Sequence, residues 1–118
     1  MKLAILFSAV LLSGCSTISN LWPRAHDPVL VDRWVSVNIA VDAVNCDEKP
    51  TGWANVVTPA DHLYQLAEFR SDPQSENLKG LWLHTQRMAQ GGSRVFCELG
   101  KKTAKARLAA ARSAWEGR

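Results

Sequence analysis

The sequence has no apolar run long enough to cross a lipid bilayer as a helix. Its longest apolar stretch, Leu3 to Leu12, contains ten residues, whereas a membrane-spanning helix needs roughly 20. The chain also has no internal repeat, and its one compositionally biased segment is an alanine-rich run at residues 104–114. We therefore expect no transmembrane helix and no repeat architecture, and the length fits one small domain.

Groups arranged for metal binding are equally scarce. The sequence holds three histidines, none of them in an HExxH motif or at another metal-ligand spacing: His26, His62 and His84. Cys46 and Cys97 each lack a second cysteine or a histidine at the spacing of a zinc site. We expect neither a metal ion nor another cofactor.

Two arrangements come closest to a catalytic site. Ser93 follows two glycines, but no G-x-S-x-G elbow is present. Asp61 and Glu68 are seven residues apart on one helical face, which would suit paired carboxylates for glycoside cleavage. Exposed carboxylates on helices are common, so we expect no catalytic residue and a protein that is not an enzyme.

The N-terminus resembles the leader of bacterial lipoprotein precursors. Lys2 and the apolar run are followed by Leu12-Ser13-Gly14-Cys15 and then by a polar stretch. The resemblance implies that residues 1–14 are a signal peptide and that Cys15 carries acyl chains such as palmitate. Ser16 is similar to precursors sorted to the outer membrane, facing the periplasm. The alternative is a buried N-terminal helix.

Assigning Cys15 to lipid leaves an even pair of cysteines. Cys46 and Cys97 would lie in a compartment that favours disulfides, and a bridge between them would contribute about 4 kcal/mol in the chain-entropy model. Two buried free thiols are the alternative. We expect a lipidated tether over residues 15–26, because this polar segment buries little surface, and a helical domain over residues 27–118.

Three dipeptides predict helix starts: Asp27-Pro28, Thr58-Pro59 and Asp72-Pro73. In each, a capping side chain precedes a proline, which has no N–H to leave unpaired. With Ser93 as a fourth cap after Gly91-Gly92, we expect helices at about 28–46, 59–70, 73–90 and 94–115. The fold class is an all-α bundle of about four helices with one disulfide.

The first predicted helix is apolar on two sides. One stripe is Leu30, Trp34, Val37, Val41 and Val44, and the other is Val31, Val35, Ile39 and Cys46. Such a helix is usually central in a small bundle. On the last helix, the buried stripe is predicted to be Cys97, Ala104, Leu108, Ala111 and Trp115.

Positive charge is concentrated near the C-terminus. Residues 101–118 hold six basic residues and one acidic residue. A candidate face for an anionic partner consists of Arg94, Lys101, Lys105 and Arg112. It is either a solvated surface or a patch for lipopolysaccharide, phospholipid or peptidoglycan. Arg107 lies near the predicted core, and we expect it either to extend its charged end to the surface or to pair with a carboxylate such as Asp42 or Asp32.

The chain is rich in tryptophan: Trp22, Trp34, Trp53, Trp82 and Trp115. They either cover the core or, in part, line a groove.

The chain resembles the small secretin pilotins in its cysteines (Cys15, Cys46 and Cys97) and in the order of its helices. Those proteins are outer-membrane lipoproteins that bind a helical peptide. The resemblance implies a non-catalytic binding or assembly lipoprotein with an envelope protein partner and no nucleic acid. Binding of an anionic envelope surface is the alternative, and a cell-wall enzyme is the third hypothesis.

Overall fold

The computed structural model describes residues 27–47 and 49–117. The predicted signal peptide at 1–14, the tether at 15–26, and with them Cys15, Trp22 and His26, lie outside the described residues. The predictions made for them therefore remain predictions.

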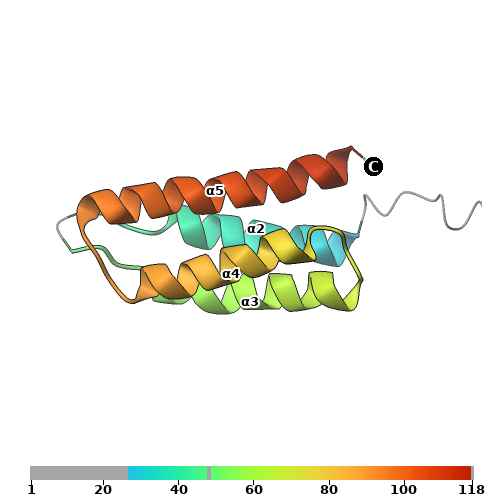
Figure 1. Ribbon diagram of the computed structural model, residues 1–118, viewed down its shortest axis with the longest axis horizontal. Coiled ribbons are helices and arrows are strands. Elements are labelled where there is room, and N and C mark those ends of the chain that lie inside the picture. Colours follow the sequence, from blue (N-terminus) through green and yellow to red (C-terminus); the bar gives the residue numbers. More distant parts are fainter. Residues whose placement is uncertain (1–26, 48, 118) are drawn as a thin grey trace, which may run out of the picture.

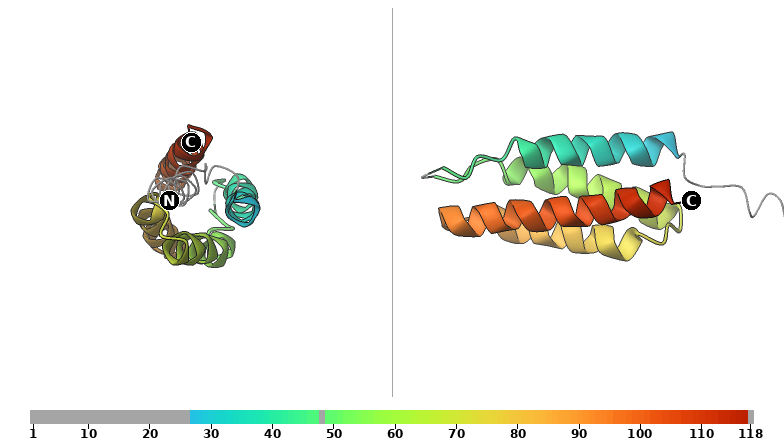
Figure 2. Two further views of the ribbon diagram at one scale, coloured as in Figure 1. Left: turned by 90° about the vertical axis from the view of Figure 1, so that its right-hand side faces the viewer. Right: turned by 90° about the horizontal axis from the view of Figure 1, so that it is seen from above.

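Four helices form the described part of the chain: α2 (Pro28–Asp42), α3 (Ala54–Phe69), α4 (Ser75–Ala89) and α5 (Arg94–Glu116). They run up and down, so that helices adjacent in sequence pack side by side and α5 returns to α2 (Figures 1 and 2). Between residues 27 and 117, apart from position 48, the only β pairing is an isolated bridge, Asn45–Thr51. The all-α prediction is confirmed.

Two of the predicted helix starts have the expected capping geometry. The carboxylate of Asp27 accepts hydrogen bonds from the backbone N–H groups of Val29 and Leu30, at 3.1 and 3.3 Å. The Ser93 hydroxyl accepts the N–H of Phe96 at 3.1 Å. Each side chain satisfies N–H groups that have no partner within the helix.

The predicted start at Thr58-Pro59 is wrong. Helix α3 begins at Ala54, and Pro59 lies inside it. Trp53 and Val56 are buried ahead of the proline, which extends the apolar face by a turn and a half. Pro59 has no N–H to donate to the carbonyl of Asn55, so α3 lacks one backbone hydrogen bond near its start.

Two further boundaries differ from the prediction. Helix α4 begins at Ser75 rather than Pro73, because the Asp72 carboxylate accepts the N–H of Gln74 at 2.8 Å in a turn before the helix. Helix α2 ends at Asp42 rather than Cys46, with Ala43 as its C-cap. Cys46 therefore lies in the loop that follows.

The core lies between the inward faces of the helices. Its largest fully buried side chains are Leu63, Leu78, Leu81, Leu108, Val37, Val41, Val56, Thr85 and Cys97. Every residue of the stripe predicted to be buried on α5 is buried. The first predicted stripe of α2, which begins at Leu30, is also buried except for the half-buried Trp34. None of the helices within 27–47 and 49–117 is long and apolar enough to cross a membrane.

The second apolar stripe of α2 is not covered, so the prediction of a central helix is wrong. Val31, Val35 and Ile39 are 45%, 40% and 63% exposed. Four helices arranged in a ring surround the core, and each has one face toward it (Figure 2). Among the described helices, none occupies a central position in which two faces would be buried.

The disulfide prediction is confirmed. Cys46 and Cys97 are bonded, with their Cα atoms 5.5 Å apart. The bridge joins the loop after α2 to the first turn of α5, as expected for Cys97. It ties the first described helix to the last.

Candidate functional site

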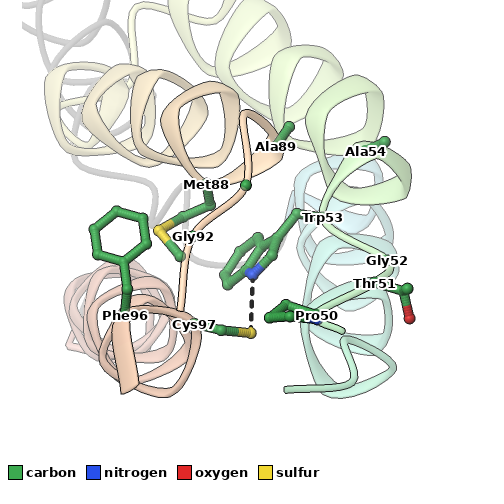
Figure 3. Close-up of a pocket in the computed structure, with 11 residues that line it drawn as sticks. Pro50, Thr51, Gly52, Trp53, Ala54, Met88, Ala89, Gly92, Phe96 and Cys97 are labelled. Atoms are coloured by element: carbon green, nitrogen blue, oxygen red, sulfur yellow. Dashed lines mark hydrogen bonds between the residues drawn. The ribbon is translucent and has the colours of Figure 1, made fainter. Parts of the chain in front are cut away.

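An apolar pocket opens at one end of the bundle. Its volume is about 280 Å³, and it lies where the loop before α3 meets the loop between α4 and α5 (Figure 3). Its lining residues are Pro50, Thr51, Gly52, Trp53, Ala54, Met88, Ala89, Gly91, Gly92, Phe96 and Cys97. This volume is slightly below the roughly 300–1,000 Å³ of small-molecule sites, and it suits one or two apolar side chains.

The first wall of the pocket is the loop that leads into α3. Asn45 and Thr51 exchange two backbone hydrogen bonds, at 3.0 and 2.9 Å. Gly52 has a φ of +104°, and a Cβ atom there would lie 3.3 Å from the Cα of Val44. Glycine therefore allows the tight return that delivers Trp53, which is only 4% exposed, to the pocket.

The second wall comes from α4 and the start of α5. A Cβ atom on Gly92 would lie 2.3 Å from the ring of Phe96, and one on Gly100 would lie 2.3 Å from the terminal methyl of Met88. Two glycines thus provide the space in which two pocket-lining side chains rest. Gly91, with a φ of +100°, ends α4 as the sequence predicts.

Two polar ring nitrogens in and behind the pocket wall are hydrogen-bonded within the molecule. In Figure 3 the indole of Trp53 points toward the sulfur of Cys97, and its Nε1 donates to this Sγ atom at 3.3 Å. Behind it, the ring of His84 lies edge-on at 6.0 Å, and His84 Nε2 donates to the carbonyl of Gly100 at 2.9 Å. The lining consequently offers apolar surface to a ligand.

Exposed apolar side chains extend this surface along the first turns of α5. Val95, Phe96 and Leu99 are 64%, 41% and 58% exposed, and Phe96 also lines the pocket. Large apolar side chains that stay exposed next to a concave site are typical of protein contact surfaces.

The pocket and the first described residue lie at opposite ends of the bundle. Helix α2 begins, and α5 ends, at the end remote from the loops that form the pocket (Figure 1). Helix α5 has 23 residues and therefore spans about 35 Å. Asp27, the first described residue, therefore lies far from this site.

The structure places the four predicted basic residues along one side of α5, and three of them pair with acidic side chains of the same molecule. Arg94 contacts Glu98 at 3.4 Å and Arg112 contacts Glu116 at 2.7 Å, both along α5. The Nζ of Lys105 donates to Asp42 at 2.8 Å.

The two lysines of this face fasten α5 to α2. Lys101 donates to the carbonyls of Asp42 and Val44, at 3.4 and 2.9 Å. Lys105 also donates to Oδ1 of Asn38 at 2.6 Å. A cation at the C-terminal carbonyls of α2 is favoured by the helix dipole, so much of the predicted anionic-partner face is engaged within the molecule.

Arg107 forms no ion pair with Asp42 or Asp32 in the described part of the chain, so that one of its two predicted arrangements is wrong. Its guanidinium lies on the α4 side of α5 and donates to the side-chain and backbone oxygens of Asn77, at 3.2 and 3.4 Å. A Cβ atom on Gly80 would lie 2.6 Å from it. Because Gly80 has no side chain, the guanidinium of Arg107 can pack directly against α4.

The described tryptophans mainly cover the core. Trp34 Nε1 donates to the Leu108 carbonyl at 2.8 Å, and Trp115 Nε1 donates to Asp72 at 3.1 Å. Trp82 stacks on Tyr64 with ring centroids 5.6 Å apart. Only Trp53 lines the pocket.

The remaining candidate residues are not brought together. Ser93 caps α5, His62 is exposed on α3 and His84 packs behind Trp53. Glu68 and Asp61 lie near Tyr64, where a hydrogen bond to Glu68 raises the pKa of the phenol above 10.0. In the described part of the chain, no group of His, Cys, Asp and Glu could hold a metal ion.

Sequence reasoning identified the components of the pocket but not the pocket. Trp53 is one of the tryptophans expected to cover the core or line a groove, and it does both. The concavity depends on Gly52 and Gly92, which admit close approaches of the chain. In the sequence, Gly52 directly precedes Trp53, and Gly92 lies four residues before Phe96. This proximity of glycine to a large aromatic residue is the only sign of the pocket in the sequence.

Comparison with protein-family models, with curated proteins and with solved structures finds no match for this chain.

Proposed function

We propose that the protein is a non-catalytic binding or assembly lipoprotein of the outer membrane, anchored on its periplasmic face by acyl chains on Cys15. Its partner is an envelope protein that inserts an apolar anchor into the pocket. The observation that carries this proposal is the apolar pocket continued by Val95, Phe96 and Leu99.

The position of the pocket supports this proposal. Residues 15–26 would reach at most about 40 Å if extended, and they join the domain at the end remote from the pocket (Figure 1). An anchor at Cys15 would keep that end within about 40 Å of the membrane, and the pocket would lie at the other end of the domain. The site would then meet proteins rather than the lipid surface.

The chemistry of the pocket also supports binding rather than turnover. Its lining residues are apolar or uncharged, and Cys97 is held in the disulfide. An apolar anchor that leaves water for such a pocket contributes roughly 1.5–3 kcal/mol, and a few anchors of this kind dominate most interfaces.

The alternative, binding of an anionic envelope surface through Arg94, Lys101, Lys105 and Arg112, has weaker support. Three of these side chains already contact a carboxylate, and the fourth contacts backbone carbonyls. An anionic ligand would have to compete with these contacts.

Site-specific photo-crosslinking tests the binding site. A photoreactive phenylalanine analogue at Ala89, on the exposed pocket rim, should crosslink one discrete protein in the native envelope. The same analogue at Gln65, exposed on the outer face of α3, should not. Ala54→Trp, which fills the pocket, should abolish the Ala89 product. Equal products from both positions, or a product insensitive to Ala54→Trp, would exclude the pocket.

Metabolic labelling with an alkyne analogue of palmitate tests the anchor. The full chain should take up the label and sediment with outer membranes, whereas Cys15→Ala should do neither. Labelling that persists in Cys15→Ala would refute the assignment of Cys15.

A further inference from the structure

The outer face of α2 carries an apolar stripe that no other part of the described chain covers. Val31, Val35 and Ile39 recur every four residues and are 40–63% exposed. The neighbouring Asp32 forms no ion pair within 27–47 and 49–117. A helix with two apolar faces normally has both covered, so this stripe is a contact surface without its partner.

The outer face of α5 carries small side chains, in contrast to the β-branched side chains on the outer face of α2. Opposite its buried stripe, the second half of the helix exposes only small side chains: Ala106, Ala109, Ala110 and Ser113. Lys102, at the edge of this face, forms no ion pair within the described residues. One helix therefore presents β-branched side chains beside an acidic group, and the other presents small side chains beside a basic group.

Contacts within the molecule fix the relative heights of these two faces along the bundle. Helices α2 and α5 are antiparallel, with Trp34 donating to Leu108 at 2.8 Å and Lys105 donating to Asn38 at 2.6 Å. It follows that Val31 lies at the level of Ser113, Val35 at that of Ala109 and Ala110, and Ile39 at that of Ala106. These pairs consist of one bulky and one small residue.

We propose that copies of this chain associate side by side in one orientation, with the outer face of α2 in one copy against the outer face of α5 in the next. At equal heights, the β-branched side chains meet the small ones, and Lys102 lies level with Asp42 of its neighbour, whose carboxylate also pairs with Lys105 of its own chain. The common orientation rests on the proposed anchor at Cys15. Because the two faces differ, the contact is heterologous and generates a ring or an open row.

Alternative pairings between copies fit less well. Two α2 faces brought together would oppose Asp32 to Asp32 and bulky side chains to one another. Two α5 faces in one orientation would place Lys102 beside Lys102. A contact of about four helical turns is also smaller than a standard interface, so association requires the confinement that a membrane anchor provides.

Disulfide trapping on membranes tests this association. Acylated full-length Val35→Cys and Ala110→Cys chains would be reconstituted together in phosphatidylethanolamine–phosphatidylglycerol vesicles and oxidised. We expect a mixed dimer whose yield rises with surface density, at least about tenfold above the yield of Val35→Cys with Gln65→Cys. Ala106→Glu, at an exposed position that suits helix, should reduce the mixed dimer about tenfold or more without changing the circular dichroism.

Three outcomes would overturn the proposal: equal yields for Ala110→Cys and Gln65→Cys, a yield unaffected by Ala106→Glu, or self-crosslinking of Val35→Cys as the main product. Palmitate labelling of the same chains separates the two proposals. Labelled chains that fail to crosslink refute the association alone, whereas unlabelled chains refute the anchor.

Discussion

The indole nitrogen of Trp53 donates a hydrogen bond to Sγ of Cys97, so the aromatic wall of the pocket rests directly on the disulfide. The bond is buried and spans 44 residues of sequence. Packing at the pocket end of the bundle and the covalent link are therefore one structural unit.

Removal of the disulfide should weaken the whole domain. In Cys46→Ser/Cys97→Ser the free energy of unfolding is expected to fall by about 2–5 kcal/mol, since the unfolded chain regains the freedom of a closed loop. Urea denaturation followed by circular dichroism measures this loss. Wild type reduced with a thiol serves as the control and should lose a similar amount. A fall in the free energy of unfolding below about 1 kcal/mol would show that helix packing stabilises the domain without the disulfide.

The phenol of Tyr64 should titrate above its ordinary range. Its hydrogen bond to Glu68, with burial and the nearby carboxylates adding to the effect, raises its pKa from 10.0. The chain has a single tyrosine, so ultraviolet absorbance of the phenolate reports on Tyr64 alone. Glu68→Gln should lower the midpoint toward 10.0.

The same pKa shift gives stability a pH dependence of known sign. The folded chain holds the phenolic proton more tightly than the unfolded chain, so Tyr64 stabilises fully below pH 10.0 and loses this contribution as the pH rises through its folded pKa. Tyr64→Phe should flatten the fall of stability in that alkaline range. An unchanged slope in Tyr64→Phe would contradict this origin.

Two helical glycines should respond differently to alanine. In Gly80→Ala the new methyl meets the half-buried guanidinium of Arg107, which can swing outward, and the gain in helix propensity of about 1 kcal/mol offsets the lost contacts. In Gly100→Ala the methyl meets the buried Met88, and overpacking should cost about 1–3 kcal/mol. Thermal denaturation of both variants would reveal this difference, and equal midpoints would contradict it.

The Asp27 side chain should contribute mainly as a helix cap. It caps α2 and contacts Arg70 at 2.7 Å. Asp27→Ala is expected to cost about 1 kcal/mol. Asp27→Asn keeps a capping oxygen and loses only an exposed ion pair, so it should cost much less. Equal losses in chemical denaturation would assign the stability to the ion pair instead.

The sequence predicts the features of this fold that depend on local chemistry. Asp27 and Ser93 cap helices because the acceptor is two or three residues from its donors. Thr58-Pro59 carries a similar pattern, yet it lies inside α3, because burial of Trp53 and Val56 favours an earlier start. Local preference is overridden where tertiary packing contributes more.

The site was less predictable for the same reason. Lys105 and Asp42 are 63 residues apart in sequence, and nothing local distinguishes that pair from Arg107 with Asp42. The exposure of Val31, Val35 and Ile39 likewise depends on how many helices surround α2. Periodicity identified both faces of the helix but could not tell which of them the bundle would cover.

The Cys46–Cys97 bond also determines how the molecule would carry mechanical load. Helices α3 and α4 lie inside the loop that the disulfide closes between two cysteines 51 positions apart. Helix α2 and most of α5 lie outside this loop, on either side of it. A pull between Asp27 and the end of α5 would run along α2, through the disulfide and along α5. The α3–α4 hairpin is shielded from that force, and a load applied at the N-terminal end is transmitted to the wall of the pocket.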